Sequence, residues 1–169
     1  MKNRKTAENS PAKLSPPKLS LAVQYASAAQ HLPTRAHLRR WVKAALRRDV
    51  SMTLRIVDEA EGRKLNKSYR GKDYATNVLT FVYNEDGQLS GDVVICAPVV
   101  EKEAAEQHKD LLSHYAHLAI HAALHLQGYD HENDADAKEM ETLETAIMLK
   151  LRRPDPYQET RTTNGRANK

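Results

Sequence analysis

The sequence predicts an α+β fold in which helices pack on a small mixed four-stranded sheet. Three observations lead to this prediction. The chain has 169 residues, of which 40% are hydrophobic and 28% charged, which is the size and balance of one globular domain. Segments with strand patterns occur only in the first hundred residues. Helical patterns dominate the second half, so the two kinds of element are partly segregated along the chain.

Four segments are typical of strands: residues 19–25, 52–56, 77–83 and 91–96. In the first, Leu19, Leu21 and Val23 alternate with small or polar residues, which indicates one buried face. The fourth contains a continuous apolar run at residues 93–96, which indicates burial on both faces. The single cysteine, Cys96, lies in this run, and we expect it to be a small core residue.

Five segments are expected to be helical: residues 35–48, 58–69, 98–105, 110–126 and 134–151. Thr34 and Asp58 are plausible N-caps, because their side-chain oxygens can accept from backbone N–H groups of the first turn. Gly128 ends the fourth helix, and two prolines, Pro154 and Pro156, stop the last one.

One folded domain is expected at residues 19–156, between disordered tails at residues 1–18 and 157–169. No apolar run approaches the roughly 20 residues needed to cross a bilayer. The N-terminus also lacks the apolar stretch of a secretory signal, so we expect a cytoplasmic protein.

Positive charge is concentrated at one end of the chain. Residues 1–50 carry 11 Lys or Arg against 2 acids, whereas residues 51–169 carry 15 against 20. Six of these bases share the helix-like segment at residues 35–48: Arg35, Arg39, Arg40, Lys43, Arg47 and Arg48. This basic face is either a solvated surface or a site for a nucleic-acid backbone.

Six of the eight histidines lie between residues 108 and 131. Four of them are spaced for one face of a helix: His114, His117, His121 and His125. Imidazoles fill a core poorly, because each ring leaves a polar nitrogen that needs a partner. The cluster therefore predicts a metal site.

Spacing indicates which histidines bind the metal. His121 and His125 are one helical turn apart and can direct both rings at one ion. His117 lies about 12 Å from His125 along the axis, so we expect it either to support the ligands or to be exposed. Gly128 lets the chain turn back, which allows His131 to provide the third ligand.

Three neutral histidines leave one position of a tetrahedral zinc ion open, which is typical of catalytic zinc. The alternative is a structural zinc whose fourth ligand is Asp130 or Asp134; otherwise these two carboxylates are candidates for orienting the histidine rings. A zinc peptidase would place a glutamate base after the first histidine, where this chain has Ala122. A phosphodiester substrate instead needs a metal-activated nucleophile and positive charge near phosphorus.

Three segments resemble the YbeY endoribonuclease family, also called rRNA maturation factors, across roughly residues 51–157. They are residues 65–73 (LNKSYRGKD) continuing into 76–81 (TNVLTF), residues 91–95 (GDVVI), and the histidine run that ends at residues 128–131 (GYDH). The chain departs from the family pattern at Ala75, Thr80 and Ala122, where Pro, Ser and Gly are common. None of these three residues is a candidate ligand.

The resemblance implies a fold similar to that of the zinc peptidases (zincin-like), with His121, His125 and His131 as ligands of one Zn²⁺ ion and Arg70 as the catalytic arginine. A guanidinium suits this role because it stays charged and its fork matches two phosphate oxygens. The family likeness further implies a single-strand-specific endoribonuclease acting in 3′ maturation of small-subunit (16S) rRNA and in ribosome quality control.

The implied partners are single-stranded RNA, the small ribosomal subunit and its associated proteins. The nucleophile is either water or the RNA 2′-hydroxyl, and these two possibilities remain open. Two other functions also remain as alternatives: a zinc peptidase with a different base, and a non-enzymatic rRNA-binding assembly factor.

Overall fold

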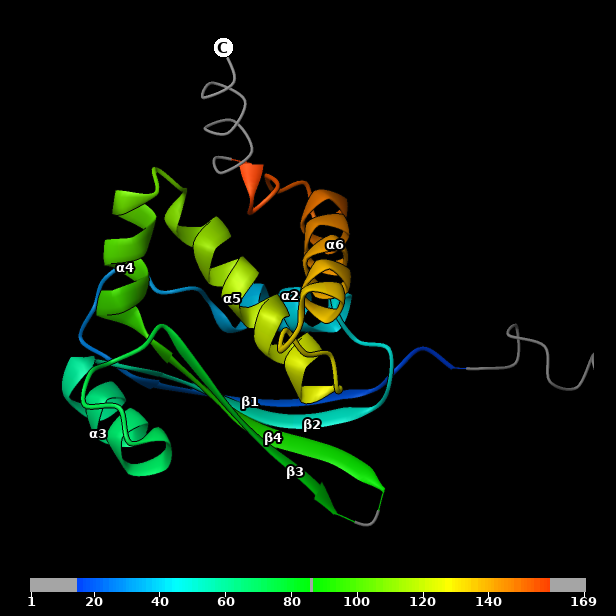
Figure 1. Ribbon diagram of the computed structural model, residues 1–169, viewed down its shortest axis with the longest axis horizontal. Coiled ribbons are helices and arrows are strands. Elements are labelled where there is room, and N and C mark those ends of the chain that lie inside the picture. Colours follow the sequence, from blue (N-terminus) through cyan, green and yellow to red (C-terminus); the bar gives the residue numbers. More distant parts are fainter. Residues whose placement is uncertain (1–14, 86, 159–169) are drawn as a thin grey trace, which may run out of the picture.

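The computed structural model describes residues 15–85 and 87–158, so most of both predicted tails lies outside the described residues. The described chain forms one twisted sheet with helices on both faces (Figure 1). No helix in this part of the chain is both long and apolar enough to span a membrane.

The sheet has four strands: β1 (Leu19–Ala26), β2 (Val50–Val57), β3 (Val78–Glu85) and β4 (Gln88–Cys96). Their order is β1-β2-β4-β3, in which β1, β2 and β4 are parallel and β3 is an antiparallel edge strand. Parallel neighbours require a crossover between them, whereas β3 and β4 are joined by a short hairpin. The predicted small mixed four-stranded sheet is therefore confirmed.

Five helices lie in the described residues: α2 (Arg35–Ala44), α3 (Glu59–Arg70), α4 (Ala97–Glu106), α5 (Leu111–Leu126) and α6 (Asp134–Lys150). Figure 1 shows α3 on one face of the sheet and the other helices on the opposite face. Among these, α5 lies at the centre and contacts α2, α4 and α6 as well as β3 and β4.

The first helix is shorter than its sequence pattern predicts. Thr34 caps α2 in a reciprocal capping box with His37, but the helix ends at Ala44. Arg47 and Arg48 therefore lie beyond the helix, in the connection to β2, and do not share a helical face with the other four bases. The Arg47 backbone N–H donates instead to the Gln127 side chain at 2.7 Å, a partner 80 residues away.

Asp58 is the N-cap residue of α3, as predicted, but its side chain makes no capping hydrogen bond. Its carboxylate accepts from the Ser27 hydroxyl and from the Ala28 backbone N–H, so it binds the connection that follows β1. These hydrogen bonds, from Ser27 first and Ala28 second, lower the pKa of Asp58.

The C-terminal end of α5 is seated tightly on the sheet. A Cβ atom at Gly91 of β4 would lie 2.6 Å from both the Leu126 Cδ1 atom and the Phe81 carbonyl oxygen. Only glycine fits at this distance, so Gly91 lets the last turn of α5 approach the sheet closely. This contact sets the distance between the sheet and the C-terminal end of α5, which carries His121 and His125.

Candidate metal centre

The four histidines of α5 have different partners along the helix. His114 is buried, and its Nε2 atom lies 2.9 Å from Glu103 Oε1 of α4. His117 and His121 both contact Glu144 of α6. His125 lies in the last turn of α5 and is half-buried. The histidines of α5 therefore fall into two groups: His114 contacts α4, and the other three lie farther along the helix toward its C-terminal end.

The chain turns back directly after α5. Gly128 adopts φ +104°, a conformation that side-chain-bearing residues rarely adopt. The turn brings His131 beside the helix, where its ring centroid lies 5.4 Å from that of His121 and 6.2 Å from that of His125. The three predicted ligands thus lie together, on the helix end and the turn that follows it.

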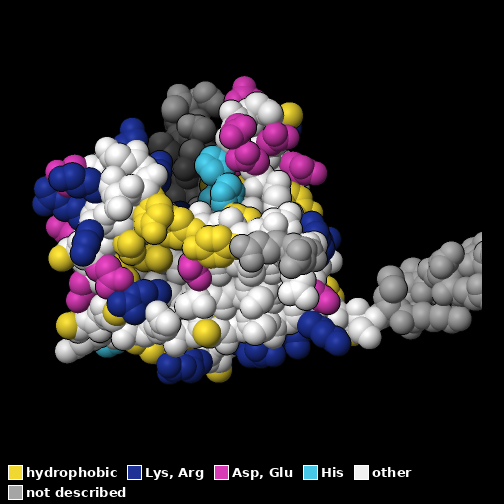
Figure 2. All heavy atoms as spheres, turned by 90° about the horizontal axis from the view of Figure 1, so that it is seen from below, with side chains coloured by type: hydrophobic (Ala, Val, Ile, Leu, Met, Phe, Trp, Pro, Cys, Tyr) yellow, Lys and Arg dark blue, Asp and Glu magenta, His cyan; other side chains and the backbone are white. Residues whose placement is uncertain are grey.

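Three residues of the described chain place their donor atoms close enough for one ion: His125, Asp130 and His131 each offer one ligand atom, and these atoms lie within 4.8 Å of one another. His121 is not in this group, and Asp130 is in it although it was not one of the three predicted ligands. His131 and Asp130 are 58% and 38% exposed, so the group opens to solvent. Figure 2 shows histidine side chains reaching the surface beside a group of acidic side chains.

Hydrogen bonds determine which ring nitrogens are free. The Nδ1 atom of His121 lies 2.6 Å from Glu144 Oε2, and the Nδ1 atom of His125 lies 3.2 Å from the Tyr129 carbonyl oxygen. Both partners can only accept, so in the neutral form of each ring Nδ1 carries the proton and Nε2 keeps its lone pair. This is the arrangement found in metal-binding histidines, and the residues present fit a divalent ion that accepts imidazole.

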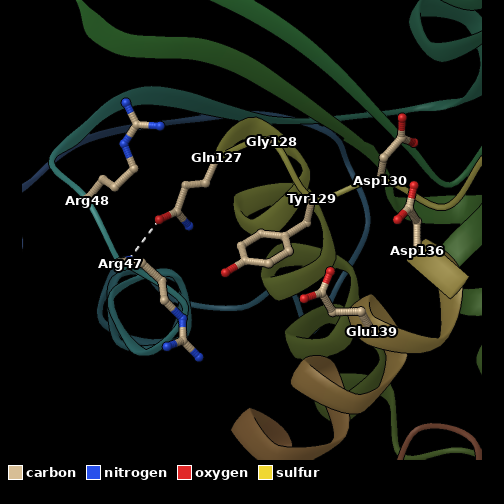
Figure 3. Close-up of a pocket in the computed structure, with 8 residues that line it drawn as sticks. All are labelled: Arg47, Arg48, Gln127, Gly128, Tyr129, Asp130, Asp136 and Glu139. Atoms are coloured by element: carbon tan, nitrogen blue, oxygen red, sulfur yellow. Dashed lines mark hydrogen bonds between the residues drawn. The ribbon is translucent and has the colours of Figure 1, made fainter.

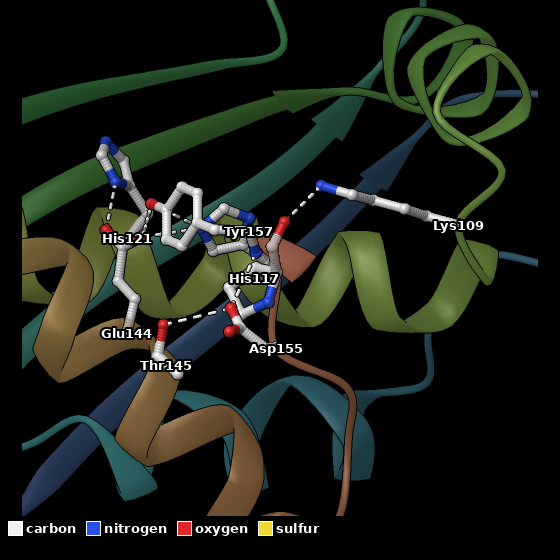
Figure 4. A network of polar contacts seen from close by, with 8 residues as sticks. Lys109, His117, His121, Glu144, Thr145, Asp155 and Tyr157 are labelled. Carbon is white, nitrogen blue, oxygen red and sulfur yellow. Dashed lines mark hydrogen bonds and ion pairs between the residues drawn. The ribbon is translucent and has the colours of Figure 1, made fainter. Parts of the chain in front are cut away.

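Glu144 is the shared partner of two histidines and a tyrosine in the polar network of Figure 4. Its side chain is 1% exposed and accepts from His117 Nε2 at 2.7 Å, from His121 and from the Tyr157 hydroxyl. Burial opposes ionisation of this carboxyl group, but the hydrogen bonds from the two histidines outweigh it and lower the pKa to about 2. Glu144 is therefore a carboxylate over the physiological pH range.

Sequence reasoning missed both Glu144 and Tyr157. Glu144 lies on the buried stripe of α6 with Met140 and Ile147, and a carboxylate at such a position was a signal that a partner faces it. Tyr157 belongs to the segment expected to be a tail, yet it reaches back from beyond α6 to the network. His117, expected to be either supporting or exposed, is 12% exposed and shares Glu144 with His121.

The two candidate aspartates differ. Asp130 is placed with the histidines, and its Oδ1 atom also accepts from the His131 backbone N–H at 2.7 Å. Asp134 is an exposed residue at the start of α6 and makes no hydrogen bond or ion pair within the described part of the chain. The structure therefore brings Asp130, and not Asp134, to the donor group.

Arg70 ends α3 and is exposed. Its Nη1 atom lies 3.4 Å from Oδ1 of the buried Asn66, and its neighbour Tyr69 packs on Phe81 of β3 with ring centroids 4.7 Å apart. Arg70 thus lies beside the edge strand that α5 contacts from the other face of the sheet. No hydrogen bond links it to a histidine among the described residues, so its catalytic role stays a prediction.

The six bases of the predicted basic face are all exposed, but they do not share one helical face. Arg35 is engaged within the fold, because it donates to the Val23 carbonyl oxygen and lies over the Tyr25 ring, 4.9 Å from its centroid. Arg39, Arg40 and Lys43 remain on α2. The last two, Arg47 and Arg48, flank the turn that follows α5.

Comparison with known proteins identifies the family of the chain. The family model for endoribonuclease YbeY matches residues 23–152. An endoribonuclease YbeY from Nitrosospira multiformis is 53% identical over 93% of this chain and 94% of its own, and one from Aromatoleum aromaticum is 59% identical over 83% and 93%. The solution structure of a Thermotoga maritima protein is 27% identical, with a TM-score of 0.55 over 83% of this chain and 93% of that one. The chain therefore belongs to the YbeY endoribonuclease family.

Proposed function

We propose that this protein is a zinc-dependent, single-strand-specific endoribonuclease of the cytoplasm. In this proposal it acts in 3′ maturation of 16S rRNA and in ribosome quality control, on RNA of the small ribosomal subunit. Membership of the endoribonuclease family supports RNA as the substrate. The observation that carries the metal assignment is the pair of Nδ1 hydrogen bonds, which leave Nε2 of His121 and His125 free beside His131.

His121, His125 and His131 would hold the ion. A divalent ion bound there supplies a Lewis acid for a phosphoryl oxygen and lowers the pKa of a water ligand. Glu144 and the Tyr129 carbonyl keep the Nδ1 protons in place, so that the two helix histidines present lone pairs. Exposure of Asp130 and His131 leaves the group accessible to a polymer.

Arg70 would neutralise charge on the phosphate that is cleaved. Its guanidinium stays charged at any working pH and can donate to two phosphate oxygens at once. Asn66, which is fully buried and donates to the Tyr74 carbonyl oxygen at 2.7 Å, accepts from Nη1 of Arg70 and so gives the guanidinium a fixed neighbour. Removing a preorganised charge of this kind costs roughly 10²–10³ in rate.

The bases left on α2 would attract RNA without reading its sequence. Arg39, Arg40 and Lys43 are exposed on one short helix. RNA affinity should therefore fall steeply as salt is added, because each phosphate contact releases counterions.

The test combines metal analysis with cleavage of single-stranded and duplex RNA. The wild-type chain should carry about one zinc ion and cleave only the single strand, whereas His125→Ala should lose both the metal and the activity. Arg70→Ala should keep the metal and lose about 10²-fold in rate. The matched control is Arg63→Ala, an exposed arginine two turns earlier on α3 whose ion pair with Asp73 is on the surface.

Each alternative predicts a different result. Turnover of unstructured protein but not of RNA would indicate a zinc peptidase. Full rRNA processing by a folded, zinc-loaded Arg70→Ala chain would indicate a non-enzymatic assembly factor. The position of Asp130 favours testing a structural zinc as well: if Asp130→Asn lowers zinc affinity as much as His121→Ala does, the carboxylate fills the fourth position. A 2′,3′-cyclic phosphate on the product would identify the 2′-hydroxyl as nucleophile.

A further inference from the structure

Two clefts flank the turn at residues 127–130 that follows α5. One has a volume of about 300 Å³ and the other about 330 Å³. Arg48, Tyr129 and Asp130 line both, so the clefts adjoin along this turn. Both volumes lie at the lower end of the range of small-ligand sites, roughly 300–1,000 Å³.

Charge distinguishes the two clefts. The first, shown in Figure 3, places Arg47 and Arg48 opposite the carboxylates of Asp130, Asp136 and Glu139. An incoming phosphate would meet three negative groups there. The second cleft has one arginine, Arg48, and one carboxylate, Asp130, among the described residues that line it, and it lacks both α6 carboxylates. Coulomb interactions therefore favour a phosphate in the second cleft.

The second cleft also opens onto the metal centre, because His125 is one of its lining residues. Its walls combine three kinds of chemistry. Val82 and Leu89, on the paired strands β3 and β4, provide an apolar wall, to which Val82, 45% exposed, contributes most of the accessible surface and Leu89, 6% exposed, contributes an edge. The exposed side-chain amide of Asn84, two residues after Val82 and opposite Leu89 in the hairpin, offers both donors and an acceptor. Arg48 contributes the positive charge.

This combination matches the parts of one nucleotide. An apolar wall suits the face of a base, an amide can hydrogen-bond the edge of a base, and a guanidinium binds a phosphate. In a duplex the faces of a base are covered by its stacked neighbours, so this wall can be used only by an unstacked base.

We propose that the second cleft binds one nucleotide of single-stranded RNA next to the phosphate that is cleaved. Arg48 holds a phosphate, Val82 and Leu89 receive the base, and Asn84 contacts the edge of the base. This assignment rests on the proposed endoribonuclease function, and it adds a binding subsite with its own specificity.

The test measures binding separately from cleavage. A 2′-O-methyl oligoribonucleotide six residues long is titrated into the full chain at several salt concentrations, and dissociation constants are read from fluorescence anisotropy. Gel electrophoresis after each titration checks that the oligomer is intact, because the methyl group blocks attack by the 2′-oxygen but not attack by water. Arg48→Ala should weaken binding about ten-fold and lower the salt slope by about 0.7, the value for one phosphate contact on a single strand. Arg47→Ala removes the same charge one residue away, from the acidic cleft, and should cost at most about three-fold.

A second variant tests the proposed contact with the edge of the base. Asn84→Ala should reduce the differences in affinity among oligomers of the four bases, while its salt slope stays at the wild-type value. Circular dichroism confirms that each variant is folded, which is expected because all three side chains are exposed.

Equal losses from Arg48→Ala and Arg47→Ala, or no loss from Arg48→Ala, would overturn the subsite even if the wild-type chain cleaves RNA. An unchanged base preference in Asn84→Ala would overturn the contact with the base edge. If the binding pattern is as expected but no cleavage occurs, the subsite stands and the proposed catalytic function fails.

Discussion

Replacing Glu144 with glutamine removes one charge from the centre of the buried network without changing the shape of the side chain. The wild-type carboxylate has two oxygens that accept from His117, His121 and Tyr157. Glutamine keeps one acceptor oxygen and adds an NH₂ group that can only donate. To avoid placing a donor against this NH₂ group, one of the two histidines must move its proton to its other ring nitrogen, beside a side chain that is only 1% exposed.

The size of the effect follows from the pKa of Glu144. Burial alone would raise this pKa, but the hydrogen bonds lower it from 4.5 to about 2. At about 1.4 kcal/mol per pH unit, the folded state favours the carboxylate over the neutral acid by about 3 kcal/mol. Glutamine is close in shape to the neutral acid, so Glu144→Gln should lower the free energy of unfolding by about 3 kcal/mol at pH 7.

Urea unfolding of the metal-free chain from pH 7 down to pH 2 measures this prediction. A depressed carboxyl pKa stabilises the fold above the unfolded-state value of 4.5, and this contribution is lost as the pH falls toward 2. The wild-type and Glu144→Gln curves should therefore converge in acid. Tyr157→Phe, which removes one donor and leaves the charge, should cost about 1 kcal/mol at pH 7. A Glu144→Gln loss below about 1 kcal/mol, or a difference that persists unchanged to pH 2, would refute the reasoning.

Three further predictions concern stabilisation of the fold by zinc, packing at Gly91, and the support that Glu144 gives to the metal ligands. Zinc at 100 times its dissociation constant should raise the free energy of unfolding by about 2.7 kcal/mol, and His125→Ala should abolish this increase in a thermal scan. Gly91→Ala should destabilise the fold by about 1–3 kcal/mol in urea, because the new Cβ atom would overlap Leu126 and Phe81. Glu144→Gln should weaken zinc binding about 10–100-fold in a chelator competition, whereas the exposed control Glu141→Gln should leave it unchanged.

The elements and the clustering of the three candidate histidines were predictable because their patterns are local. Strand alternation and helical periodicity identified the four strands and the helices of the described chain. His121, His125 and His131 lie within eleven residues of one another, so a helix of known pitch and one glycine turn are enough to bring them together.

Long-range contacts account for what local patterns missed. The apolar periodicity of α2 continues past Ala44, but the helix ends there and the Arg47 backbone pairs with Gln127, which is 80 residues away. Asp58 is a residue type that often caps helices, but its carboxylate accepts hydrogen bonds from the connection after β1, about 30 residues earlier. In both cases a partner from tertiary packing outweighs a weak local preference.

Two unusual features of the sequence, the row of histidines on α5 and the buried glutamate of α6, are explained by their contact with each other. A helix face made of imidazoles lacks acceptors for its N–H groups, and an apolar stripe that contains Glu144 lacks donors for its carboxylate. Each is costly to bury alone, and pairing the two faces gives the carboxylate its donors and gives His117 and His121 an acceptor, while the Nδ1 atom of His117 stays without a partner among the described residues. Packing α6 on α5 through this pair also fixes the His121 tautomer, since an ionised carboxylate can only accept. The interaction that makes the helix pair stable is thus the same one that prepares a ring nitrogen for a metal ion, and this is why Glu144→Gln is expected to lower both the unfolding free energy and the zinc affinity.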